Sequence, residues 1–118
     1  MDTIHSILIV EDDPATCALY ERVLGGTYRV IVQNNSAQAL KVLQSEPISV
    51  VLLEPSLAYG QGWALIADVR ATPAISRVPI VVCSSVDARR RSLALGGTAY
   101  LLKPIQPNAL LATLRQLL

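Results

Sequence analysis

The feature of this chain that most restricts its fold is the alternation of short apolar runs with segments of helical periodicity. The runs are rich in branched apolar residues, as in strands that are buried on both faces. Between them, apolar residues recur every three or four positions, which indicates helices with one buried face. Strands are predicted over residues 7–10, 28–32, 50–53, 80–83 and 100–102. Helices are predicted over residues 15–24, 36–44, 63–69, 87–96 and 108–117, with Ser36 and Asp87 as the N-caps of the second and fourth.

Alternating strands and helices imply a parallel sheet that is covered by helices on both faces. Right-handed crossovers then give a doubly wound α/β fold, whose functional site lies at the carboxyl ends of the strands. A chain of 118 residues is long enough for a single core. We therefore predict one domain that spans residues 1–118.

Composition limits the kinds of partner that this domain can have. The formal net charge of +1 shows no bias toward nucleic acids or membrane surfaces. No apolar run reaches the length of a membrane span, and the first residues do not resemble a signal peptide. Cys17 and Cys83 lie among apolar or small residues, so small core thiols are expected rather than a disulfide or a metal site. We expect a cytoplasmic domain that binds neither nucleic acid nor membrane.

Polar residues follow the predicted strands at the point where each strand ends. Glu11 and Asp12 follow the first strand, Glu54 the third, Ser84 the fourth and Lys103 the fifth. Because the carboxyl ends of parallel strands meet at one edge, these side chains should converge. Two carboxylates and a backbone carbonyl can hold Mg²⁺, while a lysine and a hydroxyl can hold the oxygens of a phosphoryl group.

The chain resembles the receiver domains of two-component response regulators over essentially its whole length. The matching stretches are ILIVEDDP, VVLLEPSLAYGQG, VPIVVCSS and AYLLKPI. The resemblance implies a flavodoxin-like (βα)5 sandwich whose parallel sheet has the strand order 2-1-3-4-5. It also implies a Mg²⁺ site formed by Glu11, Asp12, Glu54 and the backbone carbonyl of Ser56.

The same resemblance implies roles around a bound phosphoryl group. Lys103 matches the lysine that contacts the phosphoryl group, Ser84 the switch hydroxyl and Tyr100 the switch aromatic residue. Pro104 matches a proline that often follows a cis peptide bond. Glu54 stands where the family has the Asp that accepts a phosphoryl group from a histidine kinase.

A receiver-like signalling module turns over no external substrate, so we expect no enzyme and assign no catalytic residue. The expected partner is a histidine kinase, an effector domain or another signalling protein, and a homodimer is a further option.

Three departures from the family pattern affect these expectations. Glu54 is longer than Asp by one methylene, roughly 1.5 Å of carbon–carbon reach. The longer side chain moves a permanent charge toward Lys103 and Ser84, where it would imitate a phosphoryl group in part. Pro55 follows the acid directly, and Ala58 stands where the family commonly has proline, so the metal-binding loop is expected to differ. The segment from Ser84 to Lys103 is shorter than expected by about one helical turn, which indicates a trimmed fourth helix.

Simpler roles remain open for most of these residues. Glu11 and Asp12 can be ordinary polar residues at a strand end, and Lys103 can serve only to neutralise the acids. Ser84 can cap the turn after its strand, and Tyr100 can be a fixed core residue. The run of arginines from 89 to 91 is either a solvated helix face or a docking patch for an acidic partner.

Three functions are compatible with the sequence. The first is a receiver-like module that works without phosphorylation, and the second is a working phosphoacceptor receiver that uses Mg²⁺. The third is a small nucleotide- or flavin-binding enzyme of similar architecture. Against the third, the first strand is followed by EDDPAT, which places acids where a glycine-rich phosphate loop would be needed.

Overall fold

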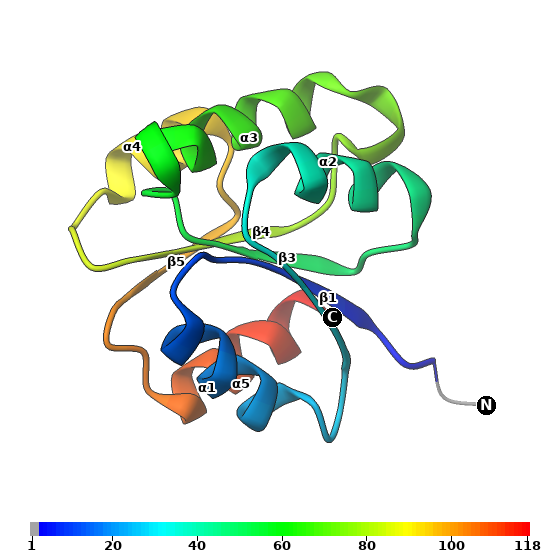
Figure 1. The fold of residues 1–118 in the computed structure, drawn as a ribbon, viewed down its shortest axis with the longest axis vertical. Coiled ribbons are helices and arrows are strands. Elements are labelled where there is room, and N and C mark those ends of the chain that lie inside the picture. The colour runs from blue at the N-terminus through cyan, green and yellow to red at the C-terminus, as the bar shows by residue number, and fades with distance from the viewer. Residues whose placement is uncertain (1–2) are drawn as a thin grey trace.

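The computed structural model describes residues 3–118, which form a five-stranded parallel sheet between two layers of helices (Figure 1). Residues 1 and 2 of the predicted domain lie outside the described part. The strands are β1 (Ser6–Val10), β2 (Arg29–Gln33), β3 (Val50–Leu53), β4 (Ile80–Ser84) and β5 (Ala99–Leu102). Their order is β2-β1-β3-β4-β5, and each neighbouring pair is parallel. The predicted fold class and strand order are confirmed.

The helices follow the strands in the predicted alternation. They are α1 (Pro14–Leu24), α2 (Ser36–Ser45), α3 (Gln61–Ala71), α4 (Arg89–Leu95) and α5 (Pro107–Leu117), with 3-10 turns η1 (Ala58–Gly60) and η2 (Pro73–Ile75). In Figure 1, α2, α3 and α4 cover one face of the sheet, and α1 and α5 cover the other. The fourth helix is short as expected, because α4 has 7 residues and α3 has 11.

Two predicted helix caps were wrong by one residue. The N-cap of α2 is Asn35, whose side chain accepts a hydrogen bond from the backbone N–H of Gln38 at 2.9 Å. Ser36 already has helical backbone, and its hydroxyl donates to the carbonyl of Gln61 at 3.0 Å. The N-cap of α4 is Ala88, although the Asp87 carboxylate still accepts from the N–H of Arg89 at 3.4 Å. Adjacent polar residues compete for a cap, and the backbone path decides between them.

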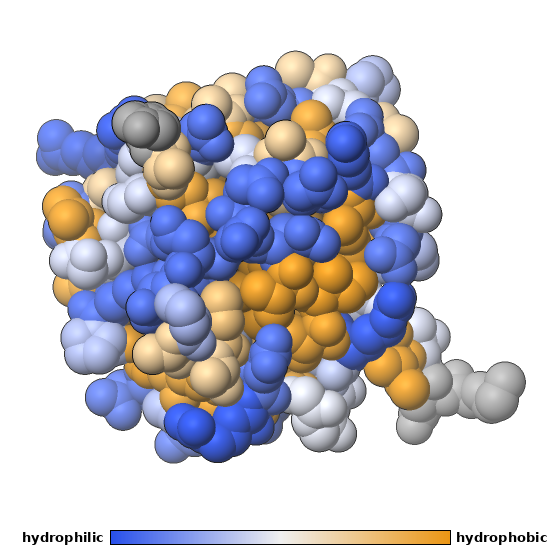
Figure 2. Space-filling view, viewed as in Figure 1, coloured by the Kyte–Doolittle hydropathy of each residue, from blue (hydrophilic) through white to orange (hydrophobic). Residues whose placement is uncertain are grey.

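Apolar packing on the two faces of the sheet holds the layers together. Side chains of β1, β3 and β4 alternate between the faces and are almost completely buried. Cys83 is buried among them, and burial raises the pKa of its thiol to about 12. Cys17 is half-buried rather than in the core, and both cysteines are free. Between the helical layers, Figure 2 shows a largely hydrophobic area, where the half-buried edge strand β2 lies in Figure 1.

No helix in residues 3–118 is long and apolar enough to cross a membrane.

Arg70, near the end of α3, links the segment before β4 to the end of α4. Its guanidinium donates to the carbonyl of Gly96 at 2.8 and 3.0 Å, after α4. It also donates to the carbonyls of Ser76 and Val78 at 3.0 and 2.6 Å, before β4. These carbonyls lie outside the regular helices and strands, so the arginine satisfies acceptors that would otherwise need solvent.

We predict that Arg70→Ala lowers the free energy of unfolding by about 2 kcal/mol, because it removes charge-assisted hydrogen bonds to several segments at once. Urea denaturation measures this change. Arg22→Ala is the matched control, since Arg22 is an exposed arginine in the last turn of α1 and should change stability by about 0.5 kcal/mol or less. Equal losses in the two variants would contradict a specific role for Arg70.

Candidate functional site

Backbone hydrogen bonds continue past the strand ends and hold the polar residues at the carboxyl edge of the sheet. They extend each ladder by one residue, so the side chains that follow β1, β3 and β5 emerge side by side. The bonds run from Glu11 N to Gln33 O at 3.1 Å, from Glu54 N to Val10 O at 2.9 Å, and from Lys103 N to Ser84 O at 2.7 Å. The peptide bond between Lys103 and Pro104 is cis, as the family resemblance implies.

Lys103 lies between two carboxylates that come from neighbouring strands. Its Nζ donates to Glu54 Oε1 at 2.7 Å and to Glu11 Oε2 at 3.1 Å. The side chain of Lys103 is only 18% exposed, and those of Glu11 and Glu54 are almost buried. Charge-assisted hydrogen bonds of this kind are strong when solvent is largely excluded. The predicted convergence of these three residues is confirmed.

Burial and pairing have opposite effects on the charges of this site. Burial raises the pKa of the Glu11 carboxyl, although the hydrogen bond from Lys103 works against that rise. Burial alone would favour the neutral amine of Lys103, but its hydrogen bonds to Glu54 and Glu11 outweigh burial and raise its pKa. Lys103 therefore remains protonated at neutral pH and neutralises part of the acidic cluster.

The second oxygen of each buried carboxylate is bound by its own loop. Glu11 Oε1 accepts from the backbone N–H of Asp13 at 3.2 Å, and Glu54 Oε2 accepts from that of Ser56 at 2.8 Å. Asp12, in contrast, is exposed to solvent. The structure thus separates the two acids that the sequence placed together, since Glu11 is buried and Asp12 is exposed.

Ser84 and Tyr100 contact the loop between β4 and α4. The buried Ser84 hydroxyl accepts from the N–H of Val86 at 3.2 Å, which is the turn-capping role that the sequence left open. The Tyr100 hydroxyl donates to the carbonyl of Val86 and accepts from the N–H of Ala88 at 3.1 Å. Both side chains therefore determine the path by which the chain enters α4.

Gly62 is a positioning residue that the sequence patterns did not single out. A Cβ atom there would lie 2.5 Å from the carbonyl oxygen of Glu54 and 2.5 Å from the Cα of Pro55. The first turn of α3 therefore packs directly on the backbone that carries Glu54. Such close approach is possible only without a side chain, and spacing alone does not reveal it.

The carboxylates suit Mg²⁺ in kind, since this ion prefers oxygen ligands. In this arrangement the ammonium of Lys103 lies between Glu11 and Glu54 and supplies the positive charge there. Within residues 3–118, no three His, Cys, Asp or Glu side chains are grouped so that they could hold a metal ion. The metal-binding role of the Ser56 carbonyl stays a prediction.

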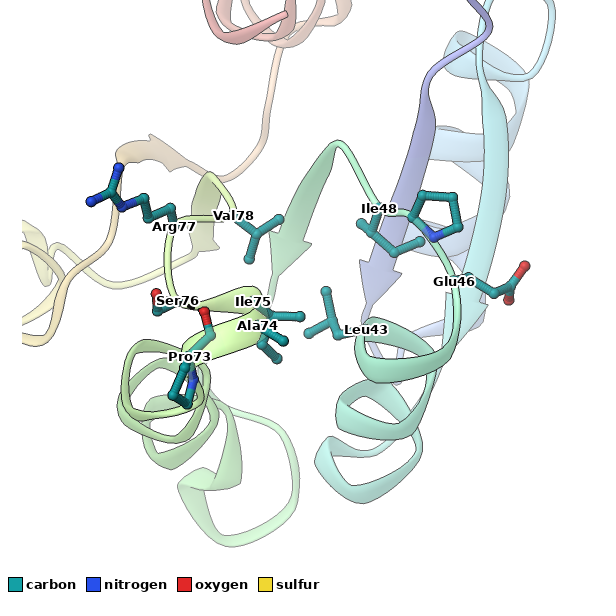
Figure 3. Close-up of a pocket in the computed structure, with 10 residues that line it drawn as sticks. Leu43, Glu46, Ile48, Pro73, Ala74, Ile75, Ser76, Arg77 and Val78 are labelled. Atoms are coloured by element: carbon teal, nitrogen blue, oxygen red, sulfur yellow. Dashed lines mark hydrogen bonds between the residues drawn. The ribbon is translucent and has the colours of Figure 1, made fainter.

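A separate cavity of about 390 Å³ lies at the opposite, amino-terminal edge of the sheet (Figure 3). Leu43, Ile48, Ile75 and Val78 point into it, while Glu46 and Arg77 point away. The polar side chains at its rim thus face solvent, and Glu46 is paired with Arg29 at 2.8 Å.

Comparisons of the sequence and of the structure with known proteins indicate the same family. Residues 7–115 match the family described as the response regulator receiver domain. The chain is 32% identical over 114 residues to the transcriptional regulatory protein ZraR of Escherichia coli K12, covering 95% of this chain and 26% of that protein. The chain thus spans about a quarter of the length of this curated relative.

Two solved structures are similar in both fold and sequence. The BeF3-activated receiver domain of Klebsiella pneumoniae RstA superposes with a TM-score of 0.84 at 34% identity, covering 95% of this chain and 97% of that one. The receiver domain of the sensor histidine kinase PA1611 of Pseudomonas aeruginosa, which has a magnesium ion in its active-site cleft, gives 0.87 at 26% identity, covering 97% of both.

The chain therefore belongs to the response regulator receiver domain family and is a receiver domain of two-component signalling. This family is the one to which the first two functions considered from the sequence belong.

We predict that Lys103→Met lowers the free energy of unfolding by about 3 kcal/mol at pH 7, because two nearly buried carboxylates lose their counter-ion. The deficit should shrink as the pH falls toward about 4, because burial already raises the pKa of Glu11 and the folded variant then takes up protons more readily than the unfolded chain. In the unaltered protein, the raised pKa of Lys103 means that its contribution persists below pH 10.5 and is lost only above its folded-state value.

Urea denaturation at several pH values tests this prediction. Lys41→Met is the control, because Lys41 is the other lysine of the chain and is exposed on α2. A deficit for Lys103→Met that is the same at pH 7 and pH 4 would show that the ammonium contributes packing rather than charge.

Proposed function

We propose that this receiver domain is a signalling module that works without phosphorylation, through contact with a partner protein and without turnover of an external substrate. Glu54 takes the position of the family's phosphoacceptor Asp. The partner is a histidine kinase, an effector domain or another signalling protein. The module rests in a state that its own Glu54 charge favours.

The observation that carries this proposal is the 2.7 Å contact between Glu54 Oε1 and Lys103 Nζ. By resemblance, Lys103 is the residue that would hold phosphoryl oxygens, and here it already binds a carboxylate of its own chain. A phosphoryl group carries a charge of about −1.5 to −2 and three strong acceptor oxygens. A carboxylate has less charge and fewer acceptors, so the imitation is partial.

The two oxygens of Glu54 also support poor reactivity toward a phosphodonor. One is bound by Lys103 and the other by the N–H of Ser56 at 2.8 Å. Phosphoryl transfer needs an attacking oxygen in line with the phosphorus, and a displacement of about 1 Å can cost on the order of 100-fold in rate. Lys103 also supplies the positive charge between Glu11 and Glu54, so this proposal requires no metal ion.

A continuous series of hydrogen bonds supports coupling between Glu54 and the start of α4. Lys103 binds Glu54 through its side chain and the carbonyl of Ser84 through its backbone N–H. The Ser84 hydroxyl binds the N–H of Val86, and Tyr100 bridges Val86 and Ala88. A change in charge at Glu54 can shift a distant surface only through such differential contacts.

A working phosphoacceptor receiver that uses Mg²⁺ is the second candidate. The presence of Glu11, Ser84 and Lys103 at the carboxyl edge favours it, because this is the set that phosphoryl chemistry would use. We rank it second because Lys103 is occupied by Glu54.

We predict that incubation with acetyl phosphate and Mg²⁺ leaves the intact mass of the unaltered protein unchanged. In Glu54→Asp, the shorter side chain frees space between the carboxylate and Lys103, so a carboxylate oxygen can attack the phosphorus as acetate leaves. Mass spectrometry compares the two proteins. If only Glu54→Asp gains the mass of a phosphoryl group, Glu54 alone blocks phosphorylation. If neither protein gains this mass, the whole pocket has lost the ability to be phosphorylated. A phosphoryl group mapped to Glu54 in the unaltered protein would overturn the proposal.

We also predict that Glu54→Gln shifts the backbone amide resonances of Val86 and Ala88 in two-dimensional NMR spectra. The neutral amide weakens the contact with Lys103, and the hydrogen-bonded series to the β4–α4 loop should respond. Glu46→Gln is the control, since Glu46 pairs with Arg29 at the other end of the molecule and should leave both amides unchanged. Unchanged Val86 and Ala88 resonances in Glu54→Gln would sink the idea of partial phosphoryl mimicry.

A further inference from the structure

Three consecutive arginines give α4 a concentrated positive charge. Arg89, Arg90 and Arg91 are all exposed. The nearby carboxylate is that of Asp87, which lies 4.0 Å from Arg89, and both side chains of this pair are more than half exposed. An exposed pair at this distance neutralises little. Positive charge therefore predominates on this surface, although the chain as a whole has a net charge of only +1.

Aromatic rings hold two of these arginines in place. The guanidinium carbon of Arg91 lies 4.5 Å from the ring centroid of Trp63 on α3, and that of Arg89 lies 5.3 Å from the ring centroid of Tyr100 on β5. Stacking on an aromatic face attracts the cation and restricts its rotamers. Such arginines lose less conformational entropy when they bind an anion than freely solvated arginines do.

Exposed apolar side chains flank the arginines. Val86 is 65% exposed and Leu93 is 76% exposed. A groove of about 200 Å³ between α4 and β5 is lined by Leu93, Ala99 and Tyr100, among others, and has room for a side chain of a partner. Arginine, tryptophan and tyrosine beside exposed aliphatic groups form the composition that is enriched where proteins bind one another.

We propose that this arginine surface, made of Arg89, Arg90, Arg91, Val86 and Leu93, binds an acidic segment of a partner protein that also carries apolar side chains. The inference rests on the proposed function and deepens it, since it states the chemistry of the partner. Carboxylates of the segment pair with the guanidinium groups, and its apolar side chains cover Leu93 and enter the groove.

Charge argues against a second copy of this chain as the occupant. The charged residues of α4, β5 and α5 are Arg89, Arg90, Arg91 and Arg115. A two-fold contact between copies through this face would bring like charges together, with Asp87 of each copy as the nearby acid.

Nucleic acid is a poorer match for the same surface. Affinity for a duplex comes mainly from many phosphate contacts, of which three arginines supply few. The exposed side chains of Val86 and Leu93 offer nothing to a phosphate backbone. An acidic protein segment with apolar residues uses both the charge and the apolar area.

The probe for this proposal is a synthetic helical peptide with glutamate and leucine on one face. Trp63 is the single tryptophan of the chain and lies under Arg91, so its fluorescence reports binding directly. We expect saturable binding at low ionic strength that weakens with added salt. Arg90→Glu should raise the dissociation constant by about tenfold or more, because it reverses a charge without removing an aromatic contact.

Arg77→Glu is the matched control, since Arg77 is an exposed arginine that points into solvent at the opposite edge of the sheet (Figure 3). It should leave the dissociation constant within about twofold, because it makes the same change in net charge far from the arginine surface. Leu93→Ser should weaken binding of the glutamate–leucine peptide but leave binding of polyglutamate unchanged.

Four results would overturn the proposal. They are no binding of the peptide, equal weakening by Arg77→Glu and Arg90→Glu, equal or tighter binding of duplex DNA, and dimerisation in sedimentation equilibrium that Arg90→Glu abolishes. The experiment uses unphosphorylated protein, so such a failure leaves the mass measurement on Glu54 unaffected. Conversely, phosphorylation of Glu54 would reject phosphorylation-independent signalling while leaving the measured peptide affinity intact.

Discussion

The ammonium of Lys103 between Glu11 and Glu54 is the interaction on which the carboxyl edge of this domain depends. A parallel sheet gathers the ends of its strands, so acids that follow β1 and β3 are forced together whatever else they do. Two nearly buried carboxylates without a counter-ion would repel each other and lose their solvation. Lys103 follows β5 and reaches across the end of β4. Its Nζ lies 3.1 Å from Glu11 Oε2 and 2.7 Å from Glu54 Oε1, which offsets both the repulsion and the lost solvation.

The same ion pair gives the domain its distinctive chemistry. In a receiver that is switched by phosphorylation, the phosphoryl group brings additional negative charge to the site. Here the carboxylate of Glu54 is part of the sequence, and its other oxygen is bound by the loop at Ser56. Under the proposed function, the signal does not depend on phosphorylation, so regulation comes from a partner protein. The proposed arginine surface on α4 is a place where such a partner would act.

The loop between β4 and α4 joins these two regions. Ser84 and Tyr100 bind it from the strands on either side, and the ring of Tyr100 also supports Arg89. The aromatic residue is thus part of two structures at once, the hydrogen-bonded loop and the positively charged helix. Because α4 has only 7 residues, its stability depends more on these contacts than on its own helical hydrogen bonds.

The sequence by itself determined the fold, because the period of its apolar residues and the polar residue after each strand allow few other arrangements. It also brought Glu11, Glu54 and Lys103 to one edge, since that follows from topology alone. It did not separate Asp12 from Glu11, because the direction of a side chain after a strand depends on the local backbone.

Only the tertiary structure decided the contacts between residues that are distant in the chain. Arg70 finds its carbonyls, Gly62 packs on the backbone of Glu54, and Arg91 stacks on Trp63 because α3 lies beside the ends of other elements. The physical reason is that periodicity reports whether a residue is buried, whereas a partner from another element is selected by three-dimensional packing, which leaves no local pattern in the sequence.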